Sequence, residues 1–320
     1  MKVQQLHVGV GTTLGPLSIF PVWTAGAGEL GISTGTHADV AVTELASGPQ
    51  VPRLTVTNNG PRPALLLEGE LLEGGQQHRT CARDVVLGPG ETRDIDTYCV
   101  EAGRWEGTHS HRRQARRAPF NVRAELATST ADPGGADRQG RIWNRVSSFD
   151  AARGRSATSS LLEHLDRLTA EPREDRRFSA DDAPAPLEGQ RGVVIGLGTQ
   201  PLLLEVFGTH TLFRRHYRQL VESALLDLEL LPPHVMASGP MPGQRGRDFA
   251  AAVQALEFGP FDGGLPALEV RNHGALRSRN ISRTAGHVAT AGIAVALPRR
   301  EPELAHLTGW NTKHPLMEIA

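Results

Sequence analysis

Short apolar segments separated by turn-forming residues dominate the first hundred positions of the chain. Residues 51–57 (VPRLTVT) alternate between apolar and polar side chains and stop at Asn58-Asn59-Gly60, a pattern typical of a strand that ends in a tight turn. Residues 64–67 (ALLL) are continuously apolar, as in a strand that is buried on both faces. The same reasoning predicts further strands at residues 3–10, 17–23, 40–43, 84–87 and 92–100.

Helical periodicity enters in the second half of the chain. Residues 159–170 place four leucines on one face, and Ser160 and Glu163 match a capping box at the start of this helix. A second amphipathic helix is predicted at residues 211–230 and a shorter one at 248–256. Further strands are predicted at residues 192–197, 202–207, 267–270 and 287–297. The pattern therefore predicts an α+β protein with a mainly antiparallel, sandwich-like β core and two or three packed amphipathic helices.

Two stretches of unusual composition suggest where the chain divides. Residues 107–123 contain five arginines and no acidic residue, and we expect them to form a solvated or mobile loop. Residues 128–140 (TSTADPGGADRQG) are turn-forming throughout and predict a flexible connection. We therefore expect an N-terminal β-rich part, residues 1–127. An α+β part, residues 141–320, would pack on it as a second domain or continue the first.

Composition limits the classes of partner and compartment. The chain has 320 residues, of which 39% are hydrophobic and 22% charged, and its formal net charge is −1. This balance gives no electrostatic reason to expect nucleic acid or a membrane surface as partner. No segment approaches the roughly 18 apolar residues that a membrane helix needs, and the first 23 residues resemble no signal peptide. With two cysteines, too few for a disulfide framework, we expect a cytoplasmic protein.

Polar side chains gather between segments that are predicted to be core strands, in residues 65–105. The first group follows an apolar strand and comprises Glu68, Glu70, Glu73, Gln76, Gln77, His78 and Arg79. A second strand and a Gly-Pro-Gly turn lead to residues 99–105 (CVEAGRW). No other part of the chain places so many polar side chains beside predicted core strands, so a functional site is expected here.

These residue types allow several kinds of chemistry. Glu68 and Glu70 lie two apart and would share one face of a strand, and clustered carboxylates can raise one pKa enough for proton transfer. Arg79 or Arg104 could hold a carboxylate or phosphate through two parallel hydrogen bonds. Gly74 would let the backbone approach a ligand closely. The alternative is a structural role, in which the same residues form ion pairs with one another and cap the ends of the strands.

Metal binding and nucleophilic catalysis find weaker support in the sequence. His78, Cys81, Cys99, His109 and His111 are close in sequence, but His78-x-x-Cys81 is only half of a zinc ligand pair, and no metal ligand is assigned. A divalent cation on the neighbouring carboxylates is a further alternative. The chain has no G-x-S-x-G motif and no cysteine in a reactive setting.

With these residues in hand, the chain resembles the ADP-ribosylglycohydrolase (ARG) and rhodanese-phosphatase-superfamily-associated protein domain family. That family carries a GE-x-L-x-G-(A/G)-x-Q-N-R segment followed by S-C-V-E-x-G-R-W. The positions that match are Gly69, Glu70, Gly74, Gln77, Arg79, Cys99, Val100, Glu101, Gly103, Arg104 and Trp105. His78 stands where asparagine is usual, and Tyr98 where serine is usual. The resemblance covers most of the chain, because residues 51–70, 141–146 and 213–230 share it.

The family name records association with ADP-ribosylglycohydrolase and phosphatase-like domains. The resemblance therefore implies a role near NAD or ADP-ribose metabolism. It implies no particular reaction and no cofactor. Our leading hypothesis is a site for a small anionic ligand, with compounds related to ADP-ribose as one candidate class. Glu70 and Glu101 would be the acid/base or hydroxyl-binding groups. The remaining site residues would be Gly74, Gln77, Arg79, Arg104 and Trp105, in which the arginines meet the anion, Gln77 orients the ligand and Trp105 stacks on a ring.

Two other hypotheses compete with ligand binding. In the first, the chain is an interaction or assembly module: the Glu and Arg motifs are structural, and the arginine-rich loop at residues 112–123 contacts a protein partner, a second copy of the chain or, less expectedly, nucleic acid. In the second, the chain is a metal-dependent hydrolase.

Overall fold

The computed structural model describes residues 1–26, 28–127, 135–172, 177–259 and 270–318. The chain divides into two compact units, each assembled from separate segments. The first, which we call the sheet unit, contains Met1–Ile32, Ala180–Arg218 and Leu231–His314. The second, the barrel unit, contains Ser33–Ser179, Gln219–Leu230 and Pro315–Ala320. The sequence-based division into residues 1–127 and 141–320 assigned consecutive segments, whereas each unit draws on both of them.

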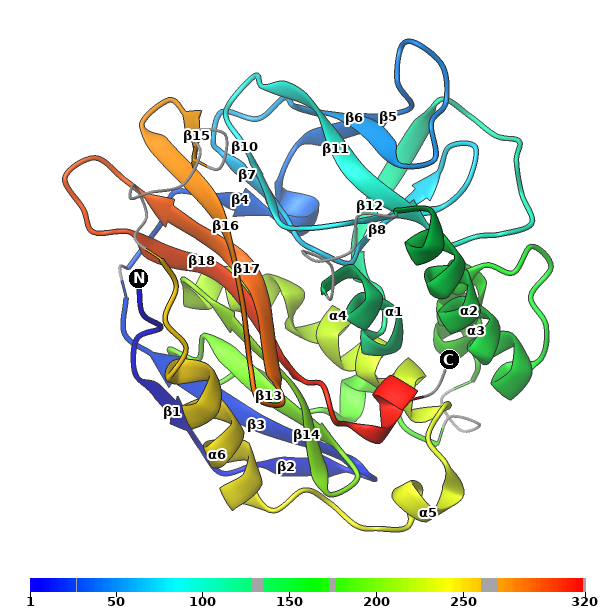
Figure 1. Ribbon diagram of the computed structural model, residues 1–320, viewed down its shortest axis with the longest axis vertical. Coiled ribbons are helices and arrows are strands. Elements are labelled where there is room, and N and C mark those ends of the chain that lie inside the picture. Colours follow the sequence, from blue (N-terminus) through cyan, green and yellow to red (C-terminus); the bar gives the residue numbers. More distant parts are fainter. Residues whose placement is uncertain (27, 128–134, 173–176, 260–269, 319–320) are drawn as a thin grey trace. The chain divides into compact units, whose positions relative to one another are not determined.

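The sheet unit is built on one antiparallel sheet of nine strands, in the order β1-β3-β13-β14-β18-β17-β16-β15 with β2 beside β3 (Figure 1). Its strands are β1 (Leu6–Val8), β2 (Thr12–Leu14), β3 (Leu17–Thr24), β13 (Gly192–Leu197), β14 (Gln200–Phe207), β15 (Val270–His273), β16 (Leu276–Ala285), β17 (Val288–Ala296) and β18 (Glu303–Asn311). Strands β13 and β14 are almost wholly buried, which explains their continuous apolar sequences.

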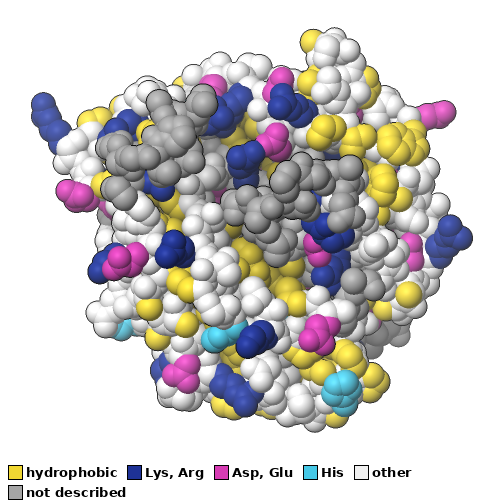
Figure 2. Space-filling view, in the orientation of Figure 1, with side chains coloured by type: hydrophobic (Ala, Val, Ile, Leu, Met, Phe, Trp, Pro, Cys, Tyr) yellow, Lys and Arg dark blue, Asp and Glu magenta, His cyan; other side chains and the backbone are white. Residues whose placement is uncertain are grey.

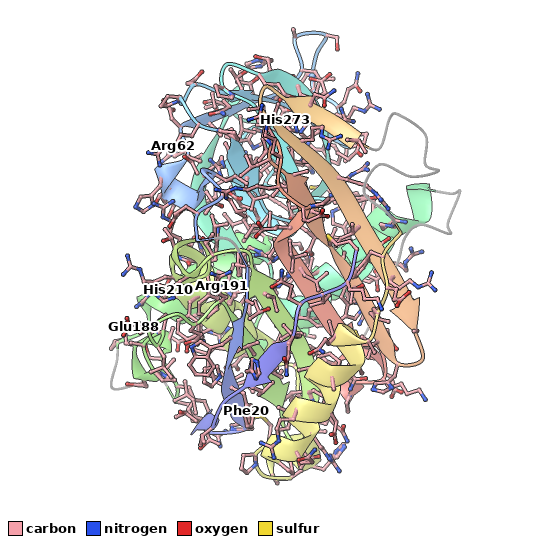
Figure 3. All side chains as sticks on the ribbon, turned by 90° about the vertical axis from the view of Figure 1, so that its left-hand side faces the viewer. Phe20, Arg62, Glu188, Arg191, His210 and His273 are labelled. Carbon is pink, nitrogen blue, oxygen red and sulfur yellow. The ribbon has the colours of Figure 1, made fainter. Side chains whose placement is uncertain are left out.

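Helix α6 (Gly243–Gln254) packs on this sheet through Phe249, Ala250 and Val253. Phe20 of β3 lies beside the start of this helix (Figure 3). The short helix α5 (Pro233–Met236) precedes it. Figure 3 also labels His210 and Arg191, which link the segments at residues 190–191 and 208–210 of this unit. His210 Nδ1 lies 2.6 Å from the Gln190 oxygen, and Arg191 Nη1 donates to the Gly208 oxygen at 2.8 Å. Sheet and helix together enclose one apolar core.

The barrel unit closes six strands into a barrel in the order β11-β6-β5-β12-β8-β9. These strands are β5 (Val40–Thr43), β6 (Arg53–Asn58), β8 (Glu70–Gly74), β9 (Arg79–Cys81), β11 (Thr92–Cys99) and β12 (Ser110–Arg117). A small sheet, β10-β7-β4, adjoins them and consists of β4 (Ser33–Thr34), β7 (Ala64–Leu66) and β10 (Val85–Leu87). The alternation of a strand is visible in β8, where Leu72 joins the barrel core and Leu71 joins the core under the helices.

The helices of the barrel unit share that second core. They are α1 (Phe120–Ala127), α2 (Gly135–Arg153), α3 (Leu161–Ala170) and the last part of α4 (His210–Leu228). Ile142, Val146 and Phe149 of α2 pack with Leu161 and Leu165 of α3. The expected α+β class with an antiparallel β core and packed amphipathic helices is confirmed.

Most predicted elements correspond to observed ones. Strand β5 has the predicted bounds, and α3 and α4 begin and end within about two residues of expectation. The loop expected at residues 107–123 is wrong, because most of it forms β12 and the start of α1. Of the expected connection, residues 128–134 lie outside the described residues, and 135–140 form the beginning of α2. Residues 267–269 of one predicted strand also lie outside them.

The predicted capping box is also wrong in its detail. Ser160 occupies the N-cap position of α3, but its side chain makes no capping hydrogen bond. The Glu163 carboxylate, which should reach back to the Ser160 amide, instead accepts a hydrogen bond from the Ala157 N–H at 2.8 Å. The Ser160 amide donates to Ser156 Oγ.

Basic and acidic side chains are interspersed over the visible part of one face (Figure 2). No helix in the described part of the chain is both long enough and apolar enough to span a membrane.

Candidate functional site

The first motif folds as the hairpin between β8 and β9, in which Leu72 pairs with Arg79. Gly74 and Gly75 turn the chain with φ values of 101° and 59°, which side-chain-bearing residues rarely adopt. A Cβ atom on Gly75 would lie 2.0 Å from His111 Nε2. The space beside these glycines is therefore filled by a side chain of β12.

The second motif follows β11 and holds the segment before α3. The Val100 oxygen accepts a hydrogen bond from the Leu161 amide at 3.0 Å, and the Gly103 amide donates to the Thr158 oxygen at 2.8 Å. Glu101 and Ser160 form an antiparallel bridge between these hydrogen bonds. A Cβ atom on Gly103 would lie 3.0–3.2 Å from the Thr158 backbone, which explains why the motif has glycine there. We call this pairing of residues 100–103 with 158–161 the motif clasp.

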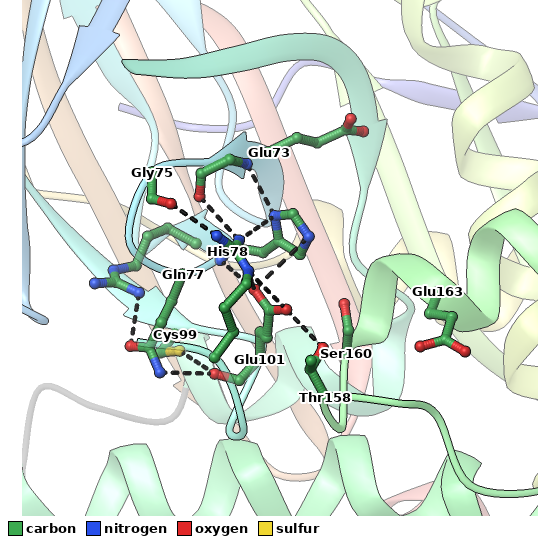
Figure 4. A network of polar contacts seen from close by, with 12 residues as sticks. Glu73, Gly75, Gln77, His78, Cys99, Glu101, Thr158, Ser160 and Glu163 are labelled. Atoms are coloured by element: carbon green, nitrogen blue, oxygen red, sulfur yellow. Dashed lines mark hydrogen bonds and ion pairs between the residues drawn. The ribbon is translucent and has the colours of Figure 1, made fainter. Parts of the chain in front are cut away.

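Glu101 is the centre of a dense network (Figure 4). Its carboxylate accepts hydrogen bonds from Thr158 Oγ1 at 2.6 Å, the His78 amide at 2.9 Å and Arg104 Nε at 3.0 Å. Burial raises the pKa of this carboxyl, but the hydrogen bonds from Arg104, Thr158 and the His78 backbone outweigh burial and hold the pKa below its ordinary value. Glu101 is therefore ionised at neutral pH.

Arg104 and His78 complete this network. The Arg104 guanidinium also donates hydrogen bonds to the backbone oxygens of Gly74, Gly75 and Glu106. Its N–H groups are therefore bonded within the protein. His78 Nδ1 accepts a hydrogen bond from the Gly74 amide at 2.9 Å, and its Nε2 lies 3.7 Å from Glu101 Oε2. Burial lowers the pKa of His78, which favours the neutral ring with the proton on Nε2.

Glu68, Glu70 and Glu73 form ion pairs with different arginines of β12 and α1. Glu70 is fully buried, and its Oε1 accepts from Arg113 Nε at 2.9 Å and Nη2 at 2.7 Å. Glu68 accepts from Arg123 Nη2 at 2.8 Å and lies 3.4 Å from Arg117 Nη2. Glu73 pairs with Arg116 at 3.2 Å, and burial raises its pKa. The three carboxylates do not share one face.

Arg79 differs from the other arginines of the network. Its side chain is 1% exposed, and its Nη1 donates to Gln77 Oε1 at 3.0 Å. In the described part of the chain Arg79 forms no ion pair, and its buried Nε has no hydrogen-bond partner. Gln77, also fully buried, donates through Nε2 to the Glu101 oxygen at 3.0 Å. This arrangement buries a cation without an anion.

Two further groups lie beside Arg79. Cys99 is its partner in the β11–β9 register, so the two side chains share one face of the sheet. The indole of Trp143, on α2, lies next to the Cys99 thiol. Burial raises the pKa of Cys99, although the hydrogen bonds with the Glu101 backbone and with the Trp143 side chain oppose this shift. We call Gln77, Arg79, Cys99 and Trp143 the Arg79 cluster.

The structure thus brings together Gly74, Gln77, Arg79, Glu101 and Arg104 in one connected network. Glu70 belongs to a separate pair with Arg113, and Trp105 is 56% exposed. The partners that sequence reasoning missed are Arg113, Arg116, Arg117, Arg123, Trp143 and Thr158. The signal that could have indicated most of these pairs was the segment 107–123, which has five arginines and no acidic residue, together with the three neighbouring glutamates at positions 68, 70 and 73.

No group of three or more His, Cys, Asp or Glu side chains within the described ranges is arranged to hold a metal ion. Cys81 and Cys99 are both buried free thiols.

Comparison with known proteins gives one result. The model of the ARG and Rhodanese-Phosphatase-superfamily-associated Protein domain matches residues 5–310. Neither the curated proteins nor the solved structures gave a match. The matched region contains both motifs, the Arg79 cluster and the motif clasp. The chain belongs to the ARG and Rhodanese-Phosphatase-superfamily-associated Protein domain family.

Proposed function

We propose that the protein binds a small anionic ligand at the Arg79 cluster. The observation that carries this proposal is the buried guanidinium of Arg79, which has Gln77 as its hydrogen-bond partner and no carboxylate within ion-pair distance in the described residues. Every other arginine of the two motifs and their surroundings named above contacts a glutamate. Arg79 is therefore the group with donors left for a ligand.

Electrostatics favours an anion at this position. Burying an unpaired charge costs several kcal/mol, and a phosphate or carboxylate would offset that cost through charge-assisted hydrogen bonds. The Trp143 indole lies beside the Cys99 thiol, and Cys99 is the register partner of Arg79. Gln77 holds Arg79 in place, because its amide is itself fixed by the Glu101 oxygen.

The ligand class we propose is a phosphate-bearing metabolite such as ADP-ribose or NAD. The family description supports this class, since it names association with ADP-ribosylglycohydrolase-type proteins. In this proposal the ion pair of Glu101 and Arg104 keeps the β8–β9 turn in position, and the exposed Trp105 stacks on a ring of the ligand. Glu70, fully occupied by Arg113, supports the barrel.

Calorimetry with ADP-ribose, NAD and inorganic phosphate tests the proposal. Removal of a charged donor costs about 1.5–3 kcal/mol, so Arg79→Gln should weaken binding at least about tenfold. Arg112→Gln, which changes an exposed arginine of β12, is the matched control and should bind as the wild type does. Absence of binding by the folded protein, or equal affinity in Arg79→Gln, would refute an anion site at Arg79.

A second candidate function is an interaction module. The observation in its favour is that Glu68, Glu70 and Glu101 are all engaged by arginines, as in a structural lock, while Trp105 is 56% exposed. Light scattering of wild type and Trp105→Ala would test whether this tryptophan contacts a second copy of the chain. We also propose a cytoplasmic location, which agrees with two free thiols.

A further inference from the structure

The segment before α3 holds polar groups that the anion site does not use. Asp150 lies near the end of α2, and His164 lies on the first turns of α3. His164 Nε2 is 2.9 Å from Asp150 Oδ1, and the histidine side chain is fully buried. The Ser156 amide donates to the same Asp150 oxygen at 2.8 Å. These contacts fix both the position and the orientation of the imidazole ring.

The protonation states of this pair follow from their surroundings. Burial lowers the pKa of His164, although Asp150 opposes this effect, so the ring is neutral at pH 7. Burial raises the pKa of Asp150, but hydrogen bonds from Ser156 and His164 outweigh it, and the carboxyl is ionised. A neutral imidazole with its Nε2–H on a carboxylate leaves Nδ1 as the atom that can accept a proton.

The hydroxyl of Ser160 forms no hydrogen bond within the described part of the protein. The residue is 3% exposed, and its buried Oγ has no hydrogen-bond partner. It occupies the N-cap position of α3 but does not bond the first-turn amides, which is what serine usually does there. The preceding residue, Ser159, has a φ of 50°, a strained value for a residue with a side chain.

A chain of polar contacts links Ser160 to His164. The Ser160 amide donates to Ser156 Oγ, the Ser156 amide donates to Asp150 Oδ1, and His164 Nε2 lies 2.9 Å from the same Asp150 oxygen. His164 is a helical residue, so its side chain leans over the turn of α3 that follows Ser160. Its Nδ1 is buried and has no hydrogen-bond partner, like Ser160 Oγ. Two unpartnered groups, a hydroxyl and a proton acceptor, thus lie on one turn.

The family motif holds this turn in its strained form. In the motif clasp the Leu161 amide donates to the Val100 oxygen at 3.0 Å, and the Ala102 amide donates to the Ser159 oxygen at 3.3 Å. Glu101 Oε1 accepts from Thr158 Oγ1 (Figure 4). The motif residues Val100, Glu101 and Gly103 therefore fix the backbone on both sides of Ser159 and Ser160.

We propose that Ser160 is the nucleophile of an acyl-transfer site, with His164 as its general base and Asp150 as the positioning residue of the histidine. Ser160 Oγ attacks the carbonyl carbon of an ester or similarly activated acyl donor, and its proton passes to His164 Nδ1. The amides of Leu162 and Glu163 in the first turn of α3 hold the oxyanion, since the Leu161 amide is bonded to the Val100 oxygen. The bond to the leaving group breaks as that group takes the proton from His164, and water then releases the acyl group by the reverse steps.

This inference goes beyond the anion site and stands on different residues. The arrangement follows the roles of a Ser-His-Asp triad without its usual sequence motif, since the three groups come from α2 and the start of α3. Ser160 and the neighbouring Ser156 are both buried, so small acyl donors and small probes are the appropriate reagents.

The test uses the whole folded protein and two reagents, diisopropyl fluorophosphate and p-nitrophenyl acetate. We expect one phosphoryl adduct, mapped to Ser160 by peptide mass spectrometry, and ester hydrolysis that the same reagent abolishes. No adduct on the folded protein, or an adduct at Ser156 or Ser159 in its place, would overturn the proposal.

Variants assign the roles. Ser160→Ala should abolish labelling and lower esterase activity at least about 100-fold, and His164→Gln should lower the labelling rate about 100-fold or more, the range of a general base. Ser147→Ala, an exposed serine of α2, is the matched control and should react as the wild type does. Full activity in folded Ser160→Ala overturns the nucleophile assignment. If His164→Gln does not fold by circular dichroism, the adduct map and Ser160→Ala decide.

Discussion

At the scale of single residues, buried charge is what distinguishes this protein. Glu70 and Arg113 are buried together, and each satisfies the other, so that neither charge is left uncompensated. Arg79 is equally buried but has an amide as its partner. The sequence indicated that these residue types would gather, because they are adjacent in the chain. It could not indicate which glutamate meets which arginine, since that depends on strands that pair only in the folded state.

The difference between Arg79 and Arg113 predicts opposite effects on stability. In the absence of anions, Arg79→Met removes an uncompensated buried charge, and we expect the free energy of unfolding to stay equal or rise by about 1–3 kcal/mol. Arg113→Met leaves Glu70 uncompensated and should lower it by about 3–5 kcal/mol. Urea unfolding of both variants measures these changes. A large loss of stability in Arg79→Met would mean that Arg79 has a structural role.

At the scale of elements, hydrophobic periodicity predicted the strands and helices whose buried faces are apolar. Strand β5 and helices α3 and α4 are of this kind. Strand β12 (SHRRQARR) has no apolar alternation, because its buried side chains are His111, Arg113 and Arg117. Arg113 pairs with Glu70 of β8 and Arg117 with Glu68 just before it, whereas His111 lies 3.2 Å from Glu44, which follows β5. Such a strand cannot be recognised from its own sequence. Helix α2 did carry a signal, since Ile142, Val146 and Phe149 have helical spacing.

The motif clasp predicts that two glycines of the barrel unit respond differently to one added methyl group. Gly103→Ala should lower the free energy of unfolding by about 1–3 kcal/mol, because its Cβ would press on the Thr158 backbone at 3.0–3.2 Å. Gly140→Ala, in helix α2 with nothing within 4 Å, should raise it by about 0.5–1 kcal/mol. Thermal melting of the two variants checks the signs. Equal effects would show that the clasp does not restrict position 103.

At the scale of the whole molecule, both units combine segments that are distant in sequence. Sequence patterns predicted the α+β class because that class follows from the kinds of element present. They did not predict the closed barrel, because closure depends on which strands become neighbours, as when β12 pairs with both β5 and β8. The sequence shows that the polar residues of each motif are close to one another in the chain. It does not show which of them become neighbours in space.

Long-range assembly of the barrel unit also creates a buried acid that makes stability depend on pH. Asp227 of α4 accepts hydrogen bonds from the amides of Phe120 at 2.6 Å and Asn121 at 3.0 Å, at the start of α1. Burial raises the pKa of Asp227 to about 7 from its ordinary value of 3.8, although these amides and Arg123 oppose the shift. The folded protein therefore keeps a proton that the unfolded chain releases between about pH 4 and 7.

The sign of the effect follows from that proton. The contribution of Asp227 to stability is greatest below about pH 4 and declines as the pH rises to 7, with a slope of up to about 1.4 kcal/mol per pH unit. Groups with lowered pKa values, such as Glu101 and Asp150, contribute with the opposite sign, so the wild-type profile alone does not isolate Asp227.

A comparison of the wild type with Asp227→Asn isolates the contribution of Asp227. The asparagine side chain keeps an oxygen that can accept from one amide of α1, and it cannot ionise. Urea unfolding between pH 4 and 8 should show the variant gaining stability relative to the wild type as the pH rises, whereas Glu106→Gln, an exposed control, should follow the wild type. Parallel profiles for wild type and Asp227→Asn would mean that Asp227 is already ionised in the folded protein near pH 4, and that the amides of α1 outweigh its burial.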